Sequence, residues 1–214
     1  MQQKTTGESS QIKVSSVRRE HGKAILTLSN GEIRMMPRAM LRERPYRSGM
    51  PFDEEAFTLL IRERSYPFAM EKAVALLSMR SRTEKEIVDA LRKNTYPEEA
   101  IARVMQRLQE VGYINDTQFA AEYSASRLSR GMGARRIAMD LRMKGVDAET
   151  IDQTVSSFDR DEVLSGAIRM ARKAANGKKL TDRADRQKIL AALLRRGYDY
   201  GTARQALDAL SEEV

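Results

Sequence analysis

The chain has 214 residues, one histidine, no cysteine and no tryptophan, and aromatic residues amount to only 6% of it. Without cysteine it forms no disulfides and has no thiolate chemistry, and one histidine leaves little material for a zinc site or a histidine-activated nucleophile. The 38 Lys and Arg exceed the 30 Asp and Glu and give a net charge of +8. Such a balance is typical of a protein with a polyanionic partner, most often nucleic acid.

The N-terminal quarter differs from the rest of the chain. Residues 1–11 are polar and predict a disordered tail, and residues 12–36 predict a three-stranded antiparallel β-ribbon. Asn30-Gly31 is a strong hairpin signal because both residues tolerate positive φ. Ala24, Leu26 and Leu28 alternate with other residues and are expected to share one face.

Residues 37–66 are expected to form a connector and a helix. A short helix is predicted at about residues 39–44. Asp53 is placed to cap a longer helix that runs to about Arg64. Pro67 is expected to separate this helix from the segment that follows, because proline breaks helices.

An apolar pattern recurs three times in the remaining sequence, at offsets of 50 and 52 residues. In each copy two apolar residues lie four apart on a first helix, and three more lie at i, i+4 and i+7 on a second helix. With an upstream helix (68–79, 116–129 or 161–175), each copy predicts a three-helix, helix-turn-helix-like repeat. The repeats, at residues 67–114, 115–159 and 160–214, predict a mainly α fold stacked as a curved solenoid. The recurring residues are Ile87, Leu91, Ile101, Met105 and Leu108; Ile137, Leu141, Ile151, Val155 and Phe158; and Ile189, Leu193, Ala203, Leu207 and Leu210.

Turn chemistry separates the two helices of each copy. Gly145 and Gly197 can adopt the left-handed conformation that ends a helix. Asp147 and Asp199 then fit as N-caps of the second helices. The first copy has no glycine at this place, and Asn94 is predicted to supply its turn.

Basic residues are concentrated in the second and third copies. Residues 126–145 hold six bases and one acid, residues 169–196 hold ten bases and two acids, and residues 146–168 between them have a net charge of −5. We predict that the basic blocks form a stripe that binds phosphates through counterion release; the alternative is an ordinary solvated surface. The predicted nucleic-acid or filament-binding residues are Arg127, Arg130, Arg135, Arg136, Arg142, Lys144, Arg172, Lys173, Lys178, Lys179, Arg183, Arg186, Lys188, Arg195 and Arg196.

We find no constellation of residues typical of an enzyme, and predict no catalytic residue, metal or cofactor. Asp116 is interpreted as a helix N-cap rather than a magnesium ligand. Tyr113 and Phe119 are interpreted as core residues rather than platforms for stacked bases. No apolar run approaches the length of a membrane span, and the N-terminus lacks a signal-peptide core, so a cytoplasmic protein without membrane contact is expected.

Several short motifs follow one another in a specific order over about residues 56–210. They are Leu77 to Glu86 (LSMRSRTEKE), Gly112-Tyr113-Ile114-Asn115-Asp116, Phe119-Ala120, Arg127, Gly131, Ile137, Leu141, Lys144-Gly145 and Arg195-Arg196-Gly197-Tyr198. In order and spacing they resemble the RecX family of bacterial recombination regulators, whose architecture is itself a tandem of three-helix repeats. The missing glycine near Thr95 departs from the usual turn of that family.

The resemblance implies a non-enzymatic modulator of the RecA recombinase, with roles in DNA recombination, DNA repair and the SOS response. Family members are thought to bind along the groove of the RecA–DNA filament and to restrain its ATPase, strand-exchange and coprotease activities. The implied partners are the RecA nucleoprotein filament and, weakly and salt-sensitively, single- and double-stranded DNA; the chain is expected to be a monomer. The acidic residues of the first copy are a weaker candidate for a basic RecA surface: Glu84, Glu86, Asp89, Glu98 and Glu99.

Two other functions stay open. A transcription-factor-like protein would place a helix in the major groove and show a sharp site preference, but the second helices of the repeats are mostly acidic or neutral. A pure protein-interaction solenoid would not bind DNA at all. A filter-binding assay separates the three functions, because a filament regulator should bind DNA weakly, salt-sensitively and without regard to sequence.

Overall fold

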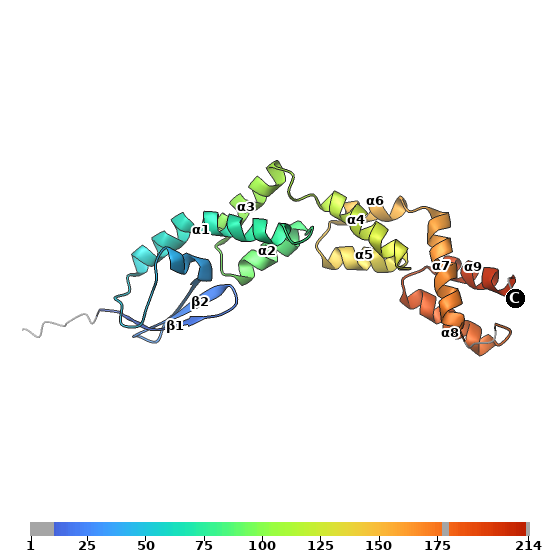
Figure 1. The fold of residues 1–214 in the computed structure, drawn as a ribbon, viewed down its shortest axis with the longest axis horizontal. Helices are drawn as coiled ribbons and strands as arrows, with labels where there is room; N and C mark the ends of the chain where they lie inside the picture. Colours follow the sequence, from blue (N-terminus) through green and yellow to red (C-terminus); the bar gives the residue numbers. More distant parts are fainter. Residues whose placement is uncertain (1–10, 177–179, 213–214) are drawn as a thin grey trace, which may run out of the picture. The chain divides into compact units, whose positions relative to one another are not determined.

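The computed structural model describes residues 11–176 and 180–212, and it is mainly helical with one small sheet (Figure 1). The chain divides into two compact units: unit 1 comprises residues 1–81 and 86–113, and unit 2 comprises residues 82–85 and 114–214. The elements of unit 1 are β1 (Val14–Arg19), β2 (Lys23–Leu28), β3 (Ile33–Pro37), the 3-10 helix η1 (Arg38–Arg42), α1 (Glu54–Leu77), most of α2 (Glu84–Lys93) and α3 (Glu98–Glu110). Those of unit 2 are α4 (Asp116–Ser129), α5 (Ala134–Met143), α6 (Ala148–Ser156), α7 (Arg160–Ala175), α8 (Arg183–Arg195) and α9 (Tyr200–Glu212).

The predicted ribbon is present as an antiparallel sheet with the strand order β1-β2-β3. Ala24, Leu26 and Leu28 are all buried, which confirms that they share one face, and they pack with Met36 and Met40. The β2–β3 connection differs in detail from the predicted two-residue turn. It spans residues 29–32, and of its Asn-Gly pair only the glycine, Gly31, has a positive φ (+85°).

Helix α1 contradicts the predicted break at Pro67. It runs without interruption from Glu54 to Leu77 with Pro67 inside it. Tertiary packing on both sides of the proline explains why the helix continues. Phe57 packs on the ribbon before it, and Ala69 and Ala73, both buried, lie on the half that packs against α3 after it.

The three-helix repeats are confirmed. The first contains the second half of α1 with α2 and α3, the second contains α4–α6, and the third contains α7–α9. All recurring apolar residues are buried, except that Val155 and Phe158 are half-buried at the edge of the second core. The curved stacking of all three repeats stays a prediction.

The turns between the two later helices of each repeat share one geometry. In the second repeat Gly145 N–H donates to Arg142 O (3.0 Å) and Val146 N–H to Leu141 O (3.1 Å), a Schellman pattern that the other two copies repeat. Gly145 and Gly197 have the predicted positive φ, +87° and +91°. In the first repeat the left-handed residue is Thr95 (φ +62°), so the prediction that Asn94 supplies this turn is wrong.

The predicted N-caps are present at Asp147 and Asp199. Each carboxylate accepts a hydrogen bond from a backbone N–H three residues on, at 2.8 Å from Thr150 and 2.9 Å from Thr202. Hydrogen bonds to Thr150 and Thr202, respectively, lower the pKa of each carboxyl. The prediction for Asp116 is wrong. Asn115 caps α4, whereas the Asp116 carboxylate accepts from Glu84 N–H (3.0 Å).

A repeated contact joins neighbouring segments of unit 2. Gly133 N–H, at the start of α5, donates to Arg196 O (2.9 Å), and Arg135 N–H donates to Gly197 O (3.1 Å) at the end of α8. At the other end of α5, the Thr83 hydroxyl donates to Lys144 O (2.6 Å). Each contact places the N-terminal end of one helix beside the carbonyls at the C-terminal end of another. The contact is favourable because the first end carries a positive partial charge and the second a negative one. We call the contact around Gly133 and Gly197 the α5–α8 junction.

Replacing Pro67 with alanine is expected to stabilise the protein by up to about 3 kcal/mol, because alanine restores the N–H that proline lacks within a helix. Pro67 is exposed, so the change leaves no cavity. Urea unfolding followed by circular dichroism measures the effect. Pro97→Ala is the matched control, because Pro97 lies at the helix start and suits that position. An equal or smaller gain for Pro67→Ala would contradict the interpretation.

Replacing Gly133 with alanine is expected to destabilise unit 2 by about 1–3 kcal/mol, the usual result of overpacking. A methyl group there would overlap the backbone of Gly197 and Tyr198, although the φ of −83° suits alanine. Gly201→Ala in α9 is the control, because its methyl group would lie 3.1 Å from the nearest atom, Asp199 Oδ1. Equal denaturation midpoints for the two variants would contradict the proposed importance of the junction.

Candidate nucleic-acid interface

Helix α5 presents an exposed strip of alternating arginine and methionine. Ile137 and Leu141 are fully buried, so residues 135, 139, 142 and 143 lie on the opposite side of the helix. Met139 and Met143 are 43% and 62% exposed. Arg135 and Arg142 are exposed, and neither guanidinium has an ion-pair partner within residues 11–176 and 180–212. Seven residues of helix separate these two charges by about 10 Å along the axis.

A buried carboxylate organises the other cations of the second repeat. Asp140 is 9% exposed and accepts a hydrogen bond from Tyr123 Oη (3.1 Å), while its other oxygen lies 3.1 Å from Arg136 Nε. The Arg127 guanidinium lies 4.6 Å from the centre of the Tyr123 ring, and Lys144 Nζ lies 5.4 Å from it. Arg127, Arg136 and Lys144 are therefore held by intramolecular contacts, and they supply positive potential in fixed positions.

The α5–α8 junction gathers arginines from both repeats. Arg196 donates through Nη1 to Gly131 O (3.4 Å), one residue after Arg130, and Arg136 packs against Gly197, two residues after Arg195. Arg169 donates through Nη2 to Ser129 O (3.2 Å). We call the α5 strip and this junction together the basic face of unit 2. It is defined by Arg130, Arg135, Arg136, Arg142, Arg169, Arg195 and Arg196, with Met139 and Met143.

Sequence reasoning missed three members of this face. Arg169 lies within a predicted basic block, but nothing in the sequence shows that it reaches the second repeat. Met139 and Met143 were detectable, because a helical period that buries Ile137 and Leu141 places positions two residues later on the exposed side.

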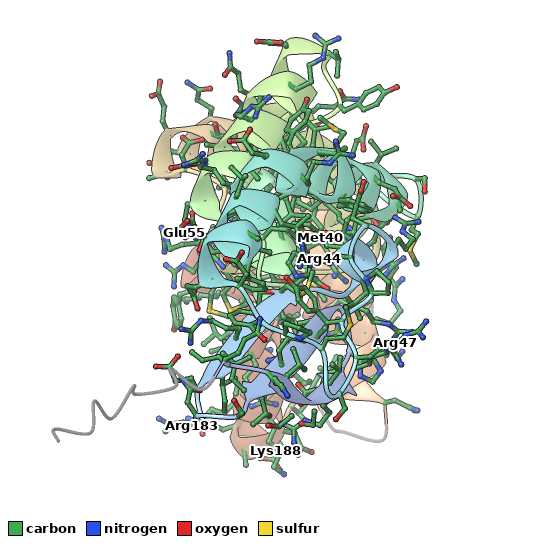
Figure 2. The ribbon with its side chains drawn as sticks, turned by 90° about the vertical axis from the view of Figure 1, so that its left-hand side faces the viewer. Met40, Arg44, Arg47, Glu55, Arg183 and Lys188 are labelled. Atoms are coloured by element: carbon green, nitrogen blue, oxygen red, sulfur yellow. The ribbon has the colours of Figure 1, made fainter. Side chains whose placement is uncertain are left out.

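Five further predicted cations lie on α7 and α8 and have different roles: Arg172, Lys173, Arg183, Arg186 and Lys188. Arg186 bonds to Asp208 (2.8 Å) and to Ser211 Oγ (2.7 Å), so it stabilises the third repeat. Lys188 lies 2.9 Å from Asp185, whose hydrogen bond raises the pKa of Lys188. Arg183 and Lys188 project outward from α8 (Figure 2).

Arg172 and Lys173 are exposed at the end of α7, and Arg172 has an intramolecular partner. The predicted residues Lys178 and Lys179 lie outside the described residues. A single stripe through all fifteen predicted residues therefore stays a prediction.

Two of the five predicted acidic residues of the first repeat are engaged with nearby cations. Glu86 binds Arg80 (2.9 Å), and Glu98 binds Arg92 (2.7 Å), which lowers the pKa of Glu98. These contacts weaken their candidacy as a separate binding surface.

The two aromatic residues predicted to lie in the core differ in burial. Phe119 is buried, as predicted, but Tyr113 is 62% exposed, so its predicted core role is wrong. Gly112 (φ +71°) ends the α3 segment, and the next apolar residue, Ile114, is buried instead.

Metal-ligand groups and membrane-spanning helices are both absent from the part of the chain that the structure describes. Within that part no three His, Asp or Glu side chains are grouped to hold a metal ion, and no helix is long and apolar enough to cross a membrane. His21 is exposed in the turn between β1 and β2.

The chain matches three family descriptions in succession: "RecX, first three-helix domain" over residues 69–108, the second such domain over residues 115–155 and the third over residues 161–207. "Regulatory protein RecX" from Streptomyces lividans is 38% identical over 156 residues, which cover 69% of this chain and 83% of the relative. The protein of the same name from Mycolicibacterium smegmatis is 33% identical over 173 residues, covering 78% and 89%.

Two solved structures share the fold. A crystal structure of regulatory protein RecX superposes with a TM-score of 0.63 at 22% identity, covering 92% of this chain and 99% of that one. The crystal structure of RecX from Lactobacillus salivarius gives a TM-score of 0.65 at 24% identity, covering 69% and 97%. Family descriptions that match all three repeats, together with relatives at this level of identity, establish that the chain belongs to the RecX family of regulatory proteins.

Proposed function

We propose that this chain is a non-enzymatic regulator that binds the RecA–DNA filament and inhibits its ATPase, strand-exchange and coprotease activities. RecX relatives named as regulatory proteins support the regulatory role, and the family resemblance supplies RecA as the partner. The observation that carries the DNA contact is the pair of exposed arginines on α5, Arg135 and Arg142, beside the arginine-rich junction. Arginines in these positions suit phosphates, which give affinity without reading sequence.

Major-groove recognition is the weaker alternative, for a reason that lies in the second helices of the repeats. Helix α6 contains no basic residue. In α3, Arg103 stacks on Tyr66 and Arg107 pairs with Glu110. In α9, Arg204 lies near Asp208. A recognition helix normally offers free Arg, Asn or Gln to base edges.

Neutralising the α5 arginines in an Arg135→Gln/Arg142→Gln variant is expected to weaken binding to single-stranded DNA about tenfold at low salt. Each lost phosphate contact should also lower the slope of log K against log salt by about 0.7. Fluorescence anisotropy over a salt series measures both quantities. Arg136 is left unchanged because its guanidinium holds Asp140.

Arg160→Gln is the control for this variant. Arg160 is also exposed but lies at the start of α7, within the acidic block. Its DNA affinity and salt slope should match those of the unaltered chain. Equal affinity of the α5 variant and this control would remove the α5 strip from the DNA contact.

The regulatory role itself is tested by the ATPase activity of RecA on single-stranded DNA, measured with increasing amounts of the full chain. Inhibition is expected, and the Arg135→Gln/Arg142→Gln variant should need a higher concentration for the same effect. An unchanged ATPase rate at saturating chain would contradict the proposed function.

A further inference from the structure

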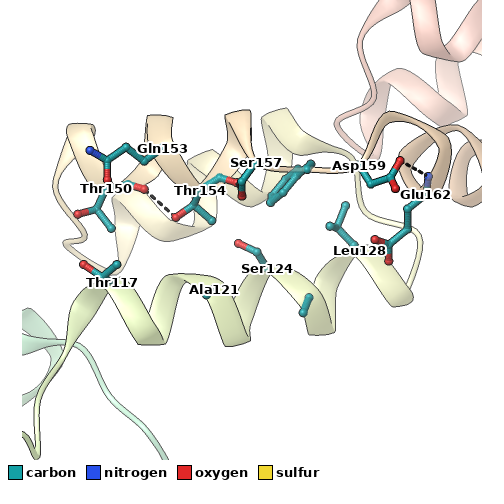
Figure 3. A pocket seen from close by; sticks show the side chains of 12 residues that line it. Thr117, Ala121, Ser124, Leu128, Thr150, Gln153, Thr154, Ser157, Asp159 and Glu162 are labelled. Atoms are coloured by element: carbon teal, nitrogen blue, oxygen red, sulfur yellow. Dashed lines mark hydrogen bonds between the residues drawn. The ribbon is translucent and has the colours of Figure 1, made fainter.

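A groove runs between α4 and α6 in the second repeat (Figure 3). Its volume is about 460 Å³, and it lies wholly within unit 2. Helix α4 contributes small side chains at successive turns, and α6 contributes hydroxyl and amide groups. The lining residues that the following argument uses are Ala121, Ser124, Ala125, Thr154, Asp159 and Glu162.

Ser124 is the unusual member of this groove. It is 1% exposed, and its Oγ has no hydrogen-bond partner among the described residues. Figure 3 shows it on the side of α4 that faces α6. Buried hydroxyl groups are nearly always hydrogen-bonded, so an unpartnered one that lines a groove indicates a position for a polar atom of a ligand.

The neighbouring hydroxyl groups differ from Ser124 because they are already satisfied. Thr154 Oγ1 donates to Thr150 O (2.7 Å), and Ser157 Oγ donates to Thr154 O (2.7 Å). Thr154 and Ser157 are therefore satisfied within α6. Ala121 and Ala125, both exposed, have small side chains that leave the groove open enough for a polypeptide backbone to approach.

The charge at the groove selects the kind of ligand. Asp159 and Glu162 line one end, and the surrounding residues 146–168 carry a net charge of −5. The one base of that block, Arg160, lines a different hollow with Asp199 and Gln205. An acidic groove repels phosphate and attracts lysine or arginine.

We propose that the α4–α6 groove binds a short, basic peptide segment of the protein component of the filament. Ser124 would bond to the peptide backbone, and Glu162 would pair with a lysine or arginine. Thr117 and Leu128 at its ends are eleven residues apart on α4, or about 16 Å, which matches about five extended residues. This inference rests on the proposed function, and it assigns protein contact to the groove and DNA contact to the basic face.

The experiment compares binding of the full chain to RecA–single-stranded DNA filaments and to naked single-stranded DNA. Ala121→Leu/Ala125→Leu fills the groove with side chains that both exposed positions can carry. We expect the affinity for the filament to fall about tenfold or more, because the leucine side chains occupy the space that the peptide would fill. The affinity for naked DNA should stay within about twofold of its original value, because the proposal places no DNA contact in the groove. Ser126→Leu is the matched control, because Ser126 is exposed on α4 and does not line the groove.

Two further variants keep the test decisive if the double leucine variant folds poorly. Ser124→Ala should weaken filament binding about fivefold, the effect of one hydrogen bond, while the Tm rises because the unpartnered hydroxyl is removed. Glu162→Lys should weaken filament binding, whereas Asp152→Lys, the same charge change outside the groove lining, should not. The inference is overturned if these groove variants bind the filament as tightly as their controls. Failure of the unaltered chain to bind or inhibit the filament would instead overturn the proposed function.

Discussion

The contact between the start of α5 and the end of α8 determines how the basic face of unit 2 is built. Two backbone N–H groups, of Gly133 and Arg135, donate to the carbonyls of Arg196 and Gly197. Both sets of groups lie at helix ends, where intrahelical partners are missing, so the contact satisfies donors and acceptors together. It requires glycine on both sides, because a side chain at Gly133 or Gly197 would overlap the opposite backbone. As a consequence, the contact brings the first turn of α5, which carries Arg135 and Arg136, beside the end of α8, which carries Arg195 and Arg196.

The cations of unit 2 have two roles that sequence alone does not distinguish. Arg136 and Arg186 have carboxylate partners, and they fix side chains or helices in place. Arg135 and Arg142 are exposed without such a partner among the described residues, so their charge is available to a polyanion. Because neither guanidinium has such a partner, changing these two side chains removes no ion pair between described residues, and we expect little effect on folding.

Unit 2 carries exposed charges of both signs, which suits the composite partner proposed above. The arginines of α5 attract phosphate, whereas Asp159 and Glu162 at the α4–α6 groove repel it. The two proposed contacts, of DNA with α5 and of protein with the α4–α6 groove, are separable by mutation because they use different helices.

The periodicity of apolar residues determined most of the fold. Ile137 and Leu141 had to share a helix face, Gly145 and Gly197 had to end helices, and the alternation of Ala24, Leu26 and Leu28 had to make a strand face, because each rule acts over a few neighbouring residues. Local rules failed where distant packing outweighed them. Helix α1 continues through Pro67 because both halves pack on other elements, and Thr95 adopts the positive φ that its position in a Schellman turn requires. The basic blocks were evident from the sequence, but their division into paired and free arginines was not. That division depends on partners far apart in the chain, such as Arg186 with Asp208 or Arg169 with Ser129, and only the tertiary structure decides which of them meet.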